Sequence, residues 1–160
     1  MFLFLSPNLP PYNHMGTRAR IGLKLEDGSI LSVYHHWDGY PEWLGVTLKE
    51  HYNTKEQIAE LIDGGNMSSC WSDNIYDVMK KEFIKIDDPK PNYYGGDDEA
   101  PRLSKNFTQF AFDSKSGEEF IYLFEDGKWN GFSIDHKYYE DGDIADTIIL
   151  PVEIPEPETV

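Results

Sequence analysis

Two stretches of the chain alternate apolar and polar side chains around an Asp-Gly pair, and each predicts a β-hairpin. In the first hairpin the pair is Asp27-Gly28, and the alternating residues run from 18 to about 36. Asp-Gly favours a two-residue turn in which both central residues have positive φ. That turn sets a register with Arg20 opposite His35, and it directs His35 and His36 to opposite faces of the sheet.

The second hairpin has the same form and carries more apolar side chains. It centres on Asp126-Gly127, and a two-residue turn there pairs Phe124 with Trp129. Aromatic and aliphatic side chains stand on both faces of this hairpin, so at least one face has to be covered. A last short strand is expected at residues 148–150.

Helical spacing of apolar residues follows the first hairpin. One helix is expected after the turn at residues 38–41, with Leu44 and Leu48 on its apolar face. Thr54 is the expected N-cap of a second helix, and Gln57 is its capping-box partner. A Gly pair ends that helix.

The middle of the chain has a less regular pattern. Residues 72–83 are predicted to form a third helix, because four apolar residues share a helical stripe. Residues 87–101 contain clusters of Pro and Gly and predict a long, mobile loop. Residues 107–112 return to the core as a strand or a short helix. The stripe consists of Ile75, Val78, Met79 and Phe83.

These elements predict an α+β fold, in which two antiparallel β-hairpins form one twisted sheet packed against two or three short helices. A single domain is expected over residues 15–150. Residues 1–14 are interpreted as an N-terminal extension, because apolar residues are followed by three prolines within five positions. Residues 151–160 hold three prolines and three glutamates with little to bury, which predicts a disordered acidic tail.

Net charge narrows the classes of partner. The chain has 29 acidic and 14 basic side chains, a formal net charge of −15. Such a field repels phosphate backbones and anionic lipids, so we expect no direct nucleic-acid binding and no membrane binding. Residues 91–160 contain 16 of the acidic side chains and 5 of the basic ones. Either solvated loops and a tail account for this excess, or the acidic surface imitates DNA toward a basic partner.

The cysteine content and the first residues indicate a reducing compartment, the cytoplasm. Cys70 is the only cysteine, which excludes an internal disulfide and a thiolate-rich metal site. Its position beside Trp71 is more typical of buried packing than of a nucleophile. Residues 1–5 are apolar but too short for a signal core. The sequence has no Gly-rich phosphate loop, no Gly-x-Ser-x-Gly elbow and no paired-cysteine metal motif, and we expect no cofactor.

Residues 35–41 bring two imidazoles, an indole, a carboxylate and a phenol together. The His-x-Asp spacing at a strand end would let His36 and Asp38 bind one divalent metal ion, or act as a general base and its partner in a hydrolase. Two ligands do not complete a metal site. The candidates for a third are Glu42, His51 and His136.

Two other interpretations of the same stretch stay open. It is a structural corner if Asp38 is a turn and cap residue, Gly39 has positive φ and His36 is a hydrogen-bonded link between sheet and helix. It is a binding groove if aromatic side chains supply stacking area and nearby cations hold a small anionic ligand, such as a nucleotide. The groove residues would be Trp37, Tyr40 and Trp43 with Arg18, Arg20 and His35.

Several short segments of the chain together match a pattern found in other small proteins. They are Met15-Gly16-Thr17-Arg18, the first Asp-Gly hairpin, His36-Trp37-Asp38-Gly39-Tyr40, Leu61-Ile62-x-x-Gly65-x-x-Ser68-Ser69, and Tyr122-Leu123-Phe124 with Gly127-Lys128-Trp129. In these segments the chain resembles a family of small uncharacterised proteins encoded by tailed bacteriophages. The resemblance covers roughly residues 15–134 and departs from the family's pattern at His35, where members usually carry Cys, and at residues 95–99, where they carry a basic loop. It implies a phage accessory protein in the cytoplasm of the infected host bacterium, with no established catalytic mechanism.

The function expected from the sequence is therefore non-enzymatic. We expect a phage accessory protein that binds and modulates a host bacterial protein, in host takeover or anti-defence, through its acidic surface or its aromatic groove. One alternative is a metal-dependent hydrolase or nucleotide-processing enzyme centred on His36 and Asp38. Another is a sponge for small anionic ligands that uses the groove without turnover.

Overall fold

The computed structural model describes residues 16–158, so the predicted N-terminal extension at residues 1–14 lies outside the described residues. The described chain forms one sheet of eight strands with three short α-helices, which agrees with the α+β class. The strands are β1 (Arg18–Lys24), β2 (Ile30–His35), β3 (Met67–Asp77), β4 (Glu82–Tyr93), β5 (Arg102–Ser104), β6 (Glu118–Glu125), β7 (Lys128–Tyr138) and β8 (Ile144–Val152). The helices are the π-helical η1 (Pro41–Gly45), α1 (Val46–His51), α2 (Lys55–Asp63), the 3-10 helix η2 (Asp97–Glu99) and α3 (Phe107–Asp113).

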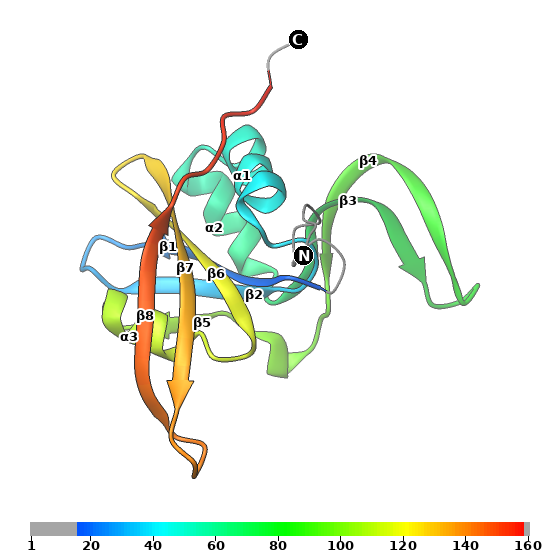
Figure 1. Ribbon diagram of the computed structural model, residues 1–160. Coiled ribbons are helices and arrows are strands. Elements are labelled where there is room, and N and C mark those ends of the chain that lie inside the picture. The colour runs from blue at the N-terminus through cyan, green and yellow to red at the C-terminus, as the bar shows by residue number, and fades with distance from the viewer. Residues whose placement is uncertain (1–15, 159–160) are drawn as a thin grey trace, which may run out of the picture.

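The strand order is β4-β3-β2-β1-β6-β7-β8, and β5 pairs with β2 (Figure 1). Strand β1 pairs antiparallel with β2 and parallel with β6, so the two Asp-Gly hairpins lie side by side in the middle of the sheet. These hairpins supply only four of the strands. The predicted arrangement of two hairpins is therefore not confirmed, and the chain is richer in strands than its sequence pattern indicated.

The β6–β7 hairpin has the predicted turn and register. Asp126 has φ 55° and Gly127 has φ 77°, as a two-residue turn with positive φ at both positions requires. Phe124 pairs with Trp129. Their rings lie 5.3 Å apart with planes at 65°, on the face covered by α1 and α2.

The β1–β2 hairpin has a longer turn than predicted. The backbone N–H of Leu25 donates to the carbonyl oxygen of Ser29 at 2.8 Å, which leaves a three-residue loop with Gly28 at φ 90°. Asp27 Oδ1 accepts a hydrogen bond from the backbone N–H of Ser29 at 3.0 Å and another from its hydroxyl. This side-chain bonding stabilises a turn followed by a left-handed glycine. The equivalent position in the second hairpin is Lys128, which has no side-chain hydroxyl to make the second of these bonds.

The extra turn residue shifts the register of the first hairpin by one. Ala19 pairs with His35, and Arg20 pairs with Tyr34. Because successive side chains point to opposite faces, Arg20 and His35 lie on opposite faces of the sheet. The predicted register would have placed them on the same face.

The predicted third helix at residues 72–83 is wrong, because these residues belong to two antiparallel strands and the turn between them. Tyr76 pairs with Phe83, and Ile75 pairs with Ile84. The helical spacing of the apolar residues in 72–83 thus arises from two strands and the turn between them. β-branched and aromatic side chains favour such cross-strand pairs over a helix. We call β3 and β4 together, residues 67–93, the ribbon.

The ribbon also replaces the start of the predicted loop at residues 87–101. Strand β4 runs through Pro89 and Pro91 and ends at Tyr93. It is an edge strand of the sheet, where proline is tolerated because its missing backbone N–H can face away from the neighbouring strand.

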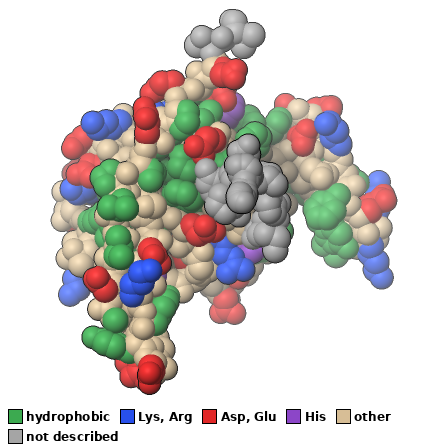
Figure 2. All heavy atoms as spheres, viewed as in Figure 1, with side chains coloured by type: hydrophobic (Ala, Val, Ile, Leu, Met, Phe, Trp, Pro, Cys, Tyr) green, Lys and Arg blue, Asp and Glu red, His purple; other side chains and the backbone are tan. Residues whose placement is uncertain are grey.

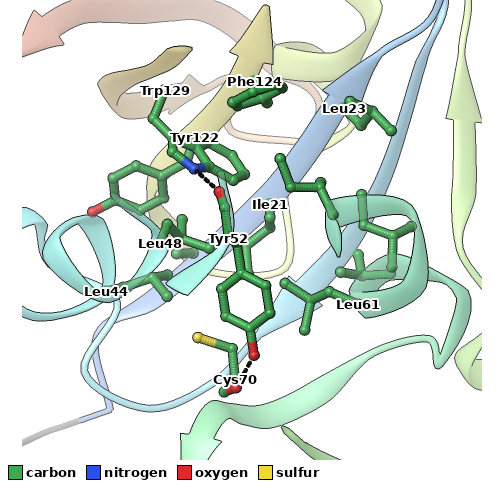
Figure 3. Packing of buried hydrophobic residues seen from close by; sticks show 14 of the residues in the cluster. Ile21, Leu23, Leu44, Leu48, Tyr52, Leu61, Cys70, Tyr122, Phe124 and Trp129 are labelled. Atoms are coloured by element: carbon green, nitrogen blue, oxygen red, sulfur yellow. Dashed lines mark hydrogen bonds between the residues drawn. The ribbon is translucent and has the colours of Figure 1, made fainter. Parts of the chain in front are cut away.

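Helices cover both faces of the central strands. The larger core cluster joins α1 and α2 to one face, and the smaller joins α3 to the other. In the larger one, the Tyr52 hydroxyl donates to the carbonyl oxygen of Cys70 and Trp129 Nε1 donates to that of Tyr52, both at 2.8 Å (Figure 3). Cys70 is buried, as predicted, and burial raises its thiol pKa to about 12. No helix in residues 16–158 has the length and apolarity needed to cross a membrane.

The chain beyond β8 differs from the disordered tail that was predicted from residue 151. Strand β8 ends at Val152, and the side chain of Ile154 is 6% exposed within the larger core cluster. Lys49 Nζ donates to the carbonyl oxygen of Ile154 at 2.8 Å and forms an ion pair with Glu156 at 2.7 Å. The packing of Ile154 and the two bonds from Lys49 thus hold this segment against the domain.

Candidate functional site

The corner after β2 extends the pairing of the sheet by two residues. The backbone N–H of His36 donates to the carbonyl oxygen of Met67 at 3.2 Å, and that of Trp37 donates to Ser68 at 3.0 Å. The imidazole of His36 is hydrogen-bonded through Nδ1 to the Tyr34 hydroxyl at 2.7 Å. These bonds fix the corner against the base of the ribbon.

The backbone of the corner turns at Asp38, which has φ 54°, and Gly39 does not have the positive φ that was predicted for it. A Cβ at Gly39 would lie 2.7 Å from the Ala19 side chain and 2.8 Å from the carbonyl oxygen of Thr17, so the glycine permits close packing on β1. The Gly39 carbonyl oxygen accepts a hydrogen bond from the buried Tyr122 hydroxyl at 2.6 Å. Asp38 makes no N-cap bond, because the next helix begins after Tyr40 and has no side-chain cap.

His36 and Trp37 form the exposed part of the corner. Their rings meet edge to face, with centroids 4.5 Å apart and planes at 89°. The side chain of Trp37 is 51% exposed. Partial burial, and after it the positive charge of Arg18, lowers the pKa of His36. The imidazole is therefore neutral at neutral pH.

The corner and the ribbon enclose a groove of about 650 Å³. On the ribbon side, the rings of Tyr76 and Phe83 make a T-shaped contact at 5.1 Å, and the Phe83 side chain is 62% exposed. Figure 1 shows the ribbon projecting from the rest of the sheet, and Figure 2 shows hydrophobic side chains gathered on it. The residues that line the groove are His36, Trp37, Ser68, Ser69, Ser72, Asn74, Tyr76, Val78, Phe83, Asn92, Tyr93 and Tyr94.

None of these lining residues is Asp, Glu, Lys or Arg, although such residues make up 27% of the chain. The ribbon as a whole carries five acidic and four basic side chains, whereas the rest of the chain carries 24 and 10. The groove is thus an uncharged, aromatic and hydroxyl-rich surface on an otherwise acidic protein.

The outer half of the ribbon receives little support from the rest of the sheet. Within β2 and β3, the only paired residues are His35 and Met67. Near the base, the Tyr93 hydroxyl donates to the carbonyl oxygen of Leu61 at 2.6 Å. Farther out the two strands pair only with each other. A two-stranded hairpin of this kind is marginally stable in water unless something packs on it.

The predicted groove residues Arg20 and His35 are buried and do not line the groove. Arg20 Nε donates to Ser32 Oγ at 2.8 Å, and its guanidinium lies 3.8 Å from a carboxylate oxygen of Glu118. Burial lowers its pKa to about 10, so it stays charged at neutral pH. On the opposite face, His35 Nε2 accepts the backbone N–H of Cys70 at 3.1 Å. The shifted register is the reason these two side chains separate.

Other predicted binding residues lie outside the groove. The Trp43 side chain is 49% exposed on η1, and Tyr40 immediately precedes that helix; neither is among the lining residues. Arg18 is exposed, and its guanidinium donates to the carbonyl oxygen of Ser116 at 3.3 Å. Of the residues predicted to bind a ligand, only Trp37 lines the groove.

The predicted third metal ligands lie in separate environments. His51 stacks on Trp71 with centroids 3.7 Å apart, and His136 is hydrogen-bonded between Thr147 and Ser114. In the part of the chain that the structure describes, no group of three or more His, Cys, Asp and Glu side chains is placed to hold a metal ion. His36 lines the groove, and residues 16–158 place no such group around it.

Sequence reasoning missed the ribbon side of the groove. Tyr76 and Phe83 were assigned to a helix, and Tyr93 and Tyr94 to a mobile loop. The available signal was the run of β-branched and aromatic residues on both sides of Lys80-Lys81, which is typical of a hairpin.

Comparison with known proteins does not supply a family. No protein-family model, curated protein or solved structure matches this chain. The resemblance to small tailed-phage proteins therefore stays a prediction from sequence, and the site has to be interpreted from its own chemistry.

Proposed function

We propose that this protein is a binding protein that holds an apolar segment of a partner protein in the groove between Trp37 and the ribbon. The observation that carries the proposal is the exposed aromatic pair Tyr76–Phe83 facing an exposed tryptophan across an uncharged groove. Aromatic side chains in such positions commonly dominate binding energy at protein interfaces.

Burial energetics support a protein segment as the occupant. Removing apolar surface from water contributes about 25 cal/mol per Å², and the exposed ribbon has such surface to offer. A bound segment would also add packing to two strands that otherwise support only each other. The serine and asparagine side chains that line the groove can donate hydrogen bonds to the backbone of a bound segment and accept hydrogen bonds from it.

The charge distribution favours this occupant over a small anion. The cations proposed for anion binding do not line the groove: Arg20 is buried beside Glu118, and Arg18, although near enough to lower the pKa of His36, donates to the Ser116 carbonyl oxygen. The acidic remainder of the chain repels nucleic acid and anionic lipid, and it attracts basic proteins over longer distances. A basic protein with an exposed apolar segment is the partner that suits both surfaces.

The cellular setting follows from the resemblance alone. If the chain is a tailed-phage accessory protein, its partner is a host bacterial protein in the cytoplasm of the infected cell. Binding would then modulate that protein in host takeover or anti-defence.

Capture from a bacterial lysate with matched variants tests the proposal. The immobilised wild-type protein is compared with Trp37→Ala and with Trp43→Ala, which removes an equally exposed tryptophan outside the groove. We expect the captured protein to be lost with Trp37→Ala and with Phe83→Ser, and to be retained with Trp43→Ala. Equal capture by Trp37→Ala and Trp43→Ala would contradict the proposal.

A further inference from the structure

We propose that the partner segment held in the groove is rich in proline and binds in the extended polyproline II conformation. This inference rests on the groove being the binding site proposed above, and it names the class of segment that the site takes. Three features of the groove carry it: the aromatic composition of the lining, the hydrogen-bond donors in the lining that have no protein partner, and the state of the strand edges beside it.

The lining offers aromatic rings and almost no aliphatic side chains. Five of its twelve residues are Trp, Tyr or Phe, and Val78 is the single aliphatic one among them. The rings of Trp37, Tyr76 and Phe83 are exposed. Aromatic faces carry partial negative charge and attract C–H groups of partial positive charge, such as those beside the proline nitrogen. Flat proline rings therefore pack well here, whereas a helix would present branched side chains that need aliphatic hollows.

The lining also contains donors that have no protein partner within residues 16–158. They are the indole N–H of Trp37, the side-chain amides of Asn74 and Asn92, and the hydroxyl of Tyr94. A polyproline II segment has no internal hydrogen bonds, and each of its prolines brings a carbonyl acceptor and no N–H donor. Trp37 Nε1, which can only donate, matches a backbone that mainly accepts.

The ribbon does not offer a continuous edge to an added strand. On the outer edge, Pro89 and Pro91 have no N–H to donate. On β3, both backbone groups of Cys70 are already bonded, the N–H to His35 Nε2 at 3.1 Å and the carbonyl oxygen to the Tyr52 hydroxyl at 2.8 Å. Pairing along either strand would therefore be interrupted.

A second interruption lies farther out on β3. The Ser72 hydroxyl accepts the backbone N–H of Asn74 at 3.0 Å and donates to the carbonyl oxygen of the same residue at 2.8 Å. A β-strand brings N–H and carbonyl groups that need a regular ladder of partners. The occupant of the groove is thus one recognised by side chains, as polyproline II segments are.

Preorganisation makes such a contact effective on a small surface. Proline fixes φ near −65°, so a proline-rich segment is already extended before it binds. A flexible apolar segment has to lose backbone freedom at each residue that it orders. Sparing this loss at a few residues is enough for about tenfold tighter binding.

The test compares two fluorescent peptides, each with a lysine at both ends. One contains nine prolines, and the other contains three Ala-Leu-Ser repeats, which are apolar but lack proline. The full-length protein is titrated into each peptide, and fluorescence anisotropy reports binding. We expect a Kd at least about tenfold lower for the proline peptide. Equal binding of the two peptides, tighter binding of the Ala-Leu-Ser peptide, or no binding of the proline peptide below 1 mM would overturn the proposal.

Matched variants locate the contact and test the donor. Trp37→Phe keeps an aromatic ring and removes the indole N–H, and we expect it to weaken binding of the proline peptide about fivefold. Trp43→Phe makes the same change at an equally exposed tryptophan outside the groove and should have no effect. Phe83→Ser should abolish binding, and circular dichroism checks that each variant folds. Equal binding by Trp37→Phe and Trp43→Phe, or undiminished binding by Phe83→Ser, would overturn the proposal.

The outcome is separable from that of the lysate test. If the proline peptide does not bind but Trp37→Ala abolishes lysate capture, the partner segment is of another kind and the proposed function stands. If the proline peptide binds in the groove but capture does not depend on Trp37, the groove recognises proline and the proposed function fails.

Discussion

Arg20 and His35 show how burial decides what a charged or titratable side chain does in this protein. Both were expected to line a surface groove, and the fold places each in the core on a different face of the sheet. Arg20 keeps its charge beside Glu118. His35 is held neutral, because burial lowers its pKa to about 3. Each has a measurable effect on stability that a groove residue would not have.

Removing one member of the buried ion pair should be costly. Glu118→Ala leaves the Arg20 guanidinium charged without its carboxylate, and we expect the free energy of unfolding to fall by about 3–5 kcal/mol. Urea unfolding followed by circular dichroism measures this change. Glu119→Ala, at the exposed neighbouring position, should change stability little. An equal effect of the two substitutions would show that the Arg20–Glu118 ion pair does not stabilise the fold.

The low pKa of His35 predicts a pH dependence of stability. Between pH 6.5 and about 3, the unfolded chain binds a proton at this imidazole that the folded chain does not. Stability is therefore fully present above pH 6.5 and falls as the pH drops through that window. Urea midpoints at pH 7, 6 and 5 should decline for wild type and decline less for His35→Gln. Parallel declines would assign the effect to other groups.

At the scale of elements, local turn and cap chemistry was predictable, and the partner of each strand was not. Thr54 and Gln57 form the predicted capping box, and Asp126-Gly127 forms the predicted turn, because both depend on residues within four positions. The first hairpin is shifted by one residue from its predicted register, and its longer turn is stabilised by two hydrogen bonds from Ser29 to Asp27. One wall of the candidate site is the ribbon. Its apolar residues are spaced as in a helix, and this spacing hid the pairing of Tyr76 with Phe83, seven residues later.

The limited support of the ribbon predicts its dynamics. Backbone amides in the outer ribbon, residues 74–84, should exchange with deuterium faster than those of β1 and β6, which have strands on both sides. Hydrogen-exchange mass spectrometry measures this difference. Binding of a partner should slow exchange in the outer ribbon and leave β7 and β8 unchanged. Protection confined to β8 would place the partner on the opposite edge of the sheet.

At the scale of the whole molecule, most of the acidic charge lies outside the ribbon that forms the proposed binding groove. The ribbon is nearly balanced in charge, and the rest of the chain holds 24 acidic side chains against 10 basic ones. Long-range attraction and short-range contact should therefore come from different parts of the protein. An acidic surface that itself imitated DNA would combine them.

The salt dependence of the binding rates distinguishes these two arrangements. Raising salt from 0.05 M to 0.5 M shortens the screening length to well under 10 Å, so association with a basic partner should slow by tenfold or more. Dissociation should change by less than about twofold, because the groove is uncharged. Biolayer interferometry with the purified partner measures both rates. Dissociation that accelerates strongly with salt would favour the acidic surface as the contact.

The central claim is that the groove between Trp37 and the ribbon is where this protein binds its partner. Site-specific photo-crosslinking in the bacterial cytoplasm tests it most directly, with a photoreactive phenylalanine at Phe83 or, as a control, at Leu103, which is equally exposed outside the groove. The account predicts a covalent adduct with another protein from position 83 and none from position 103. Adducts from position 103 alone, or equally from both positions, would contradict it.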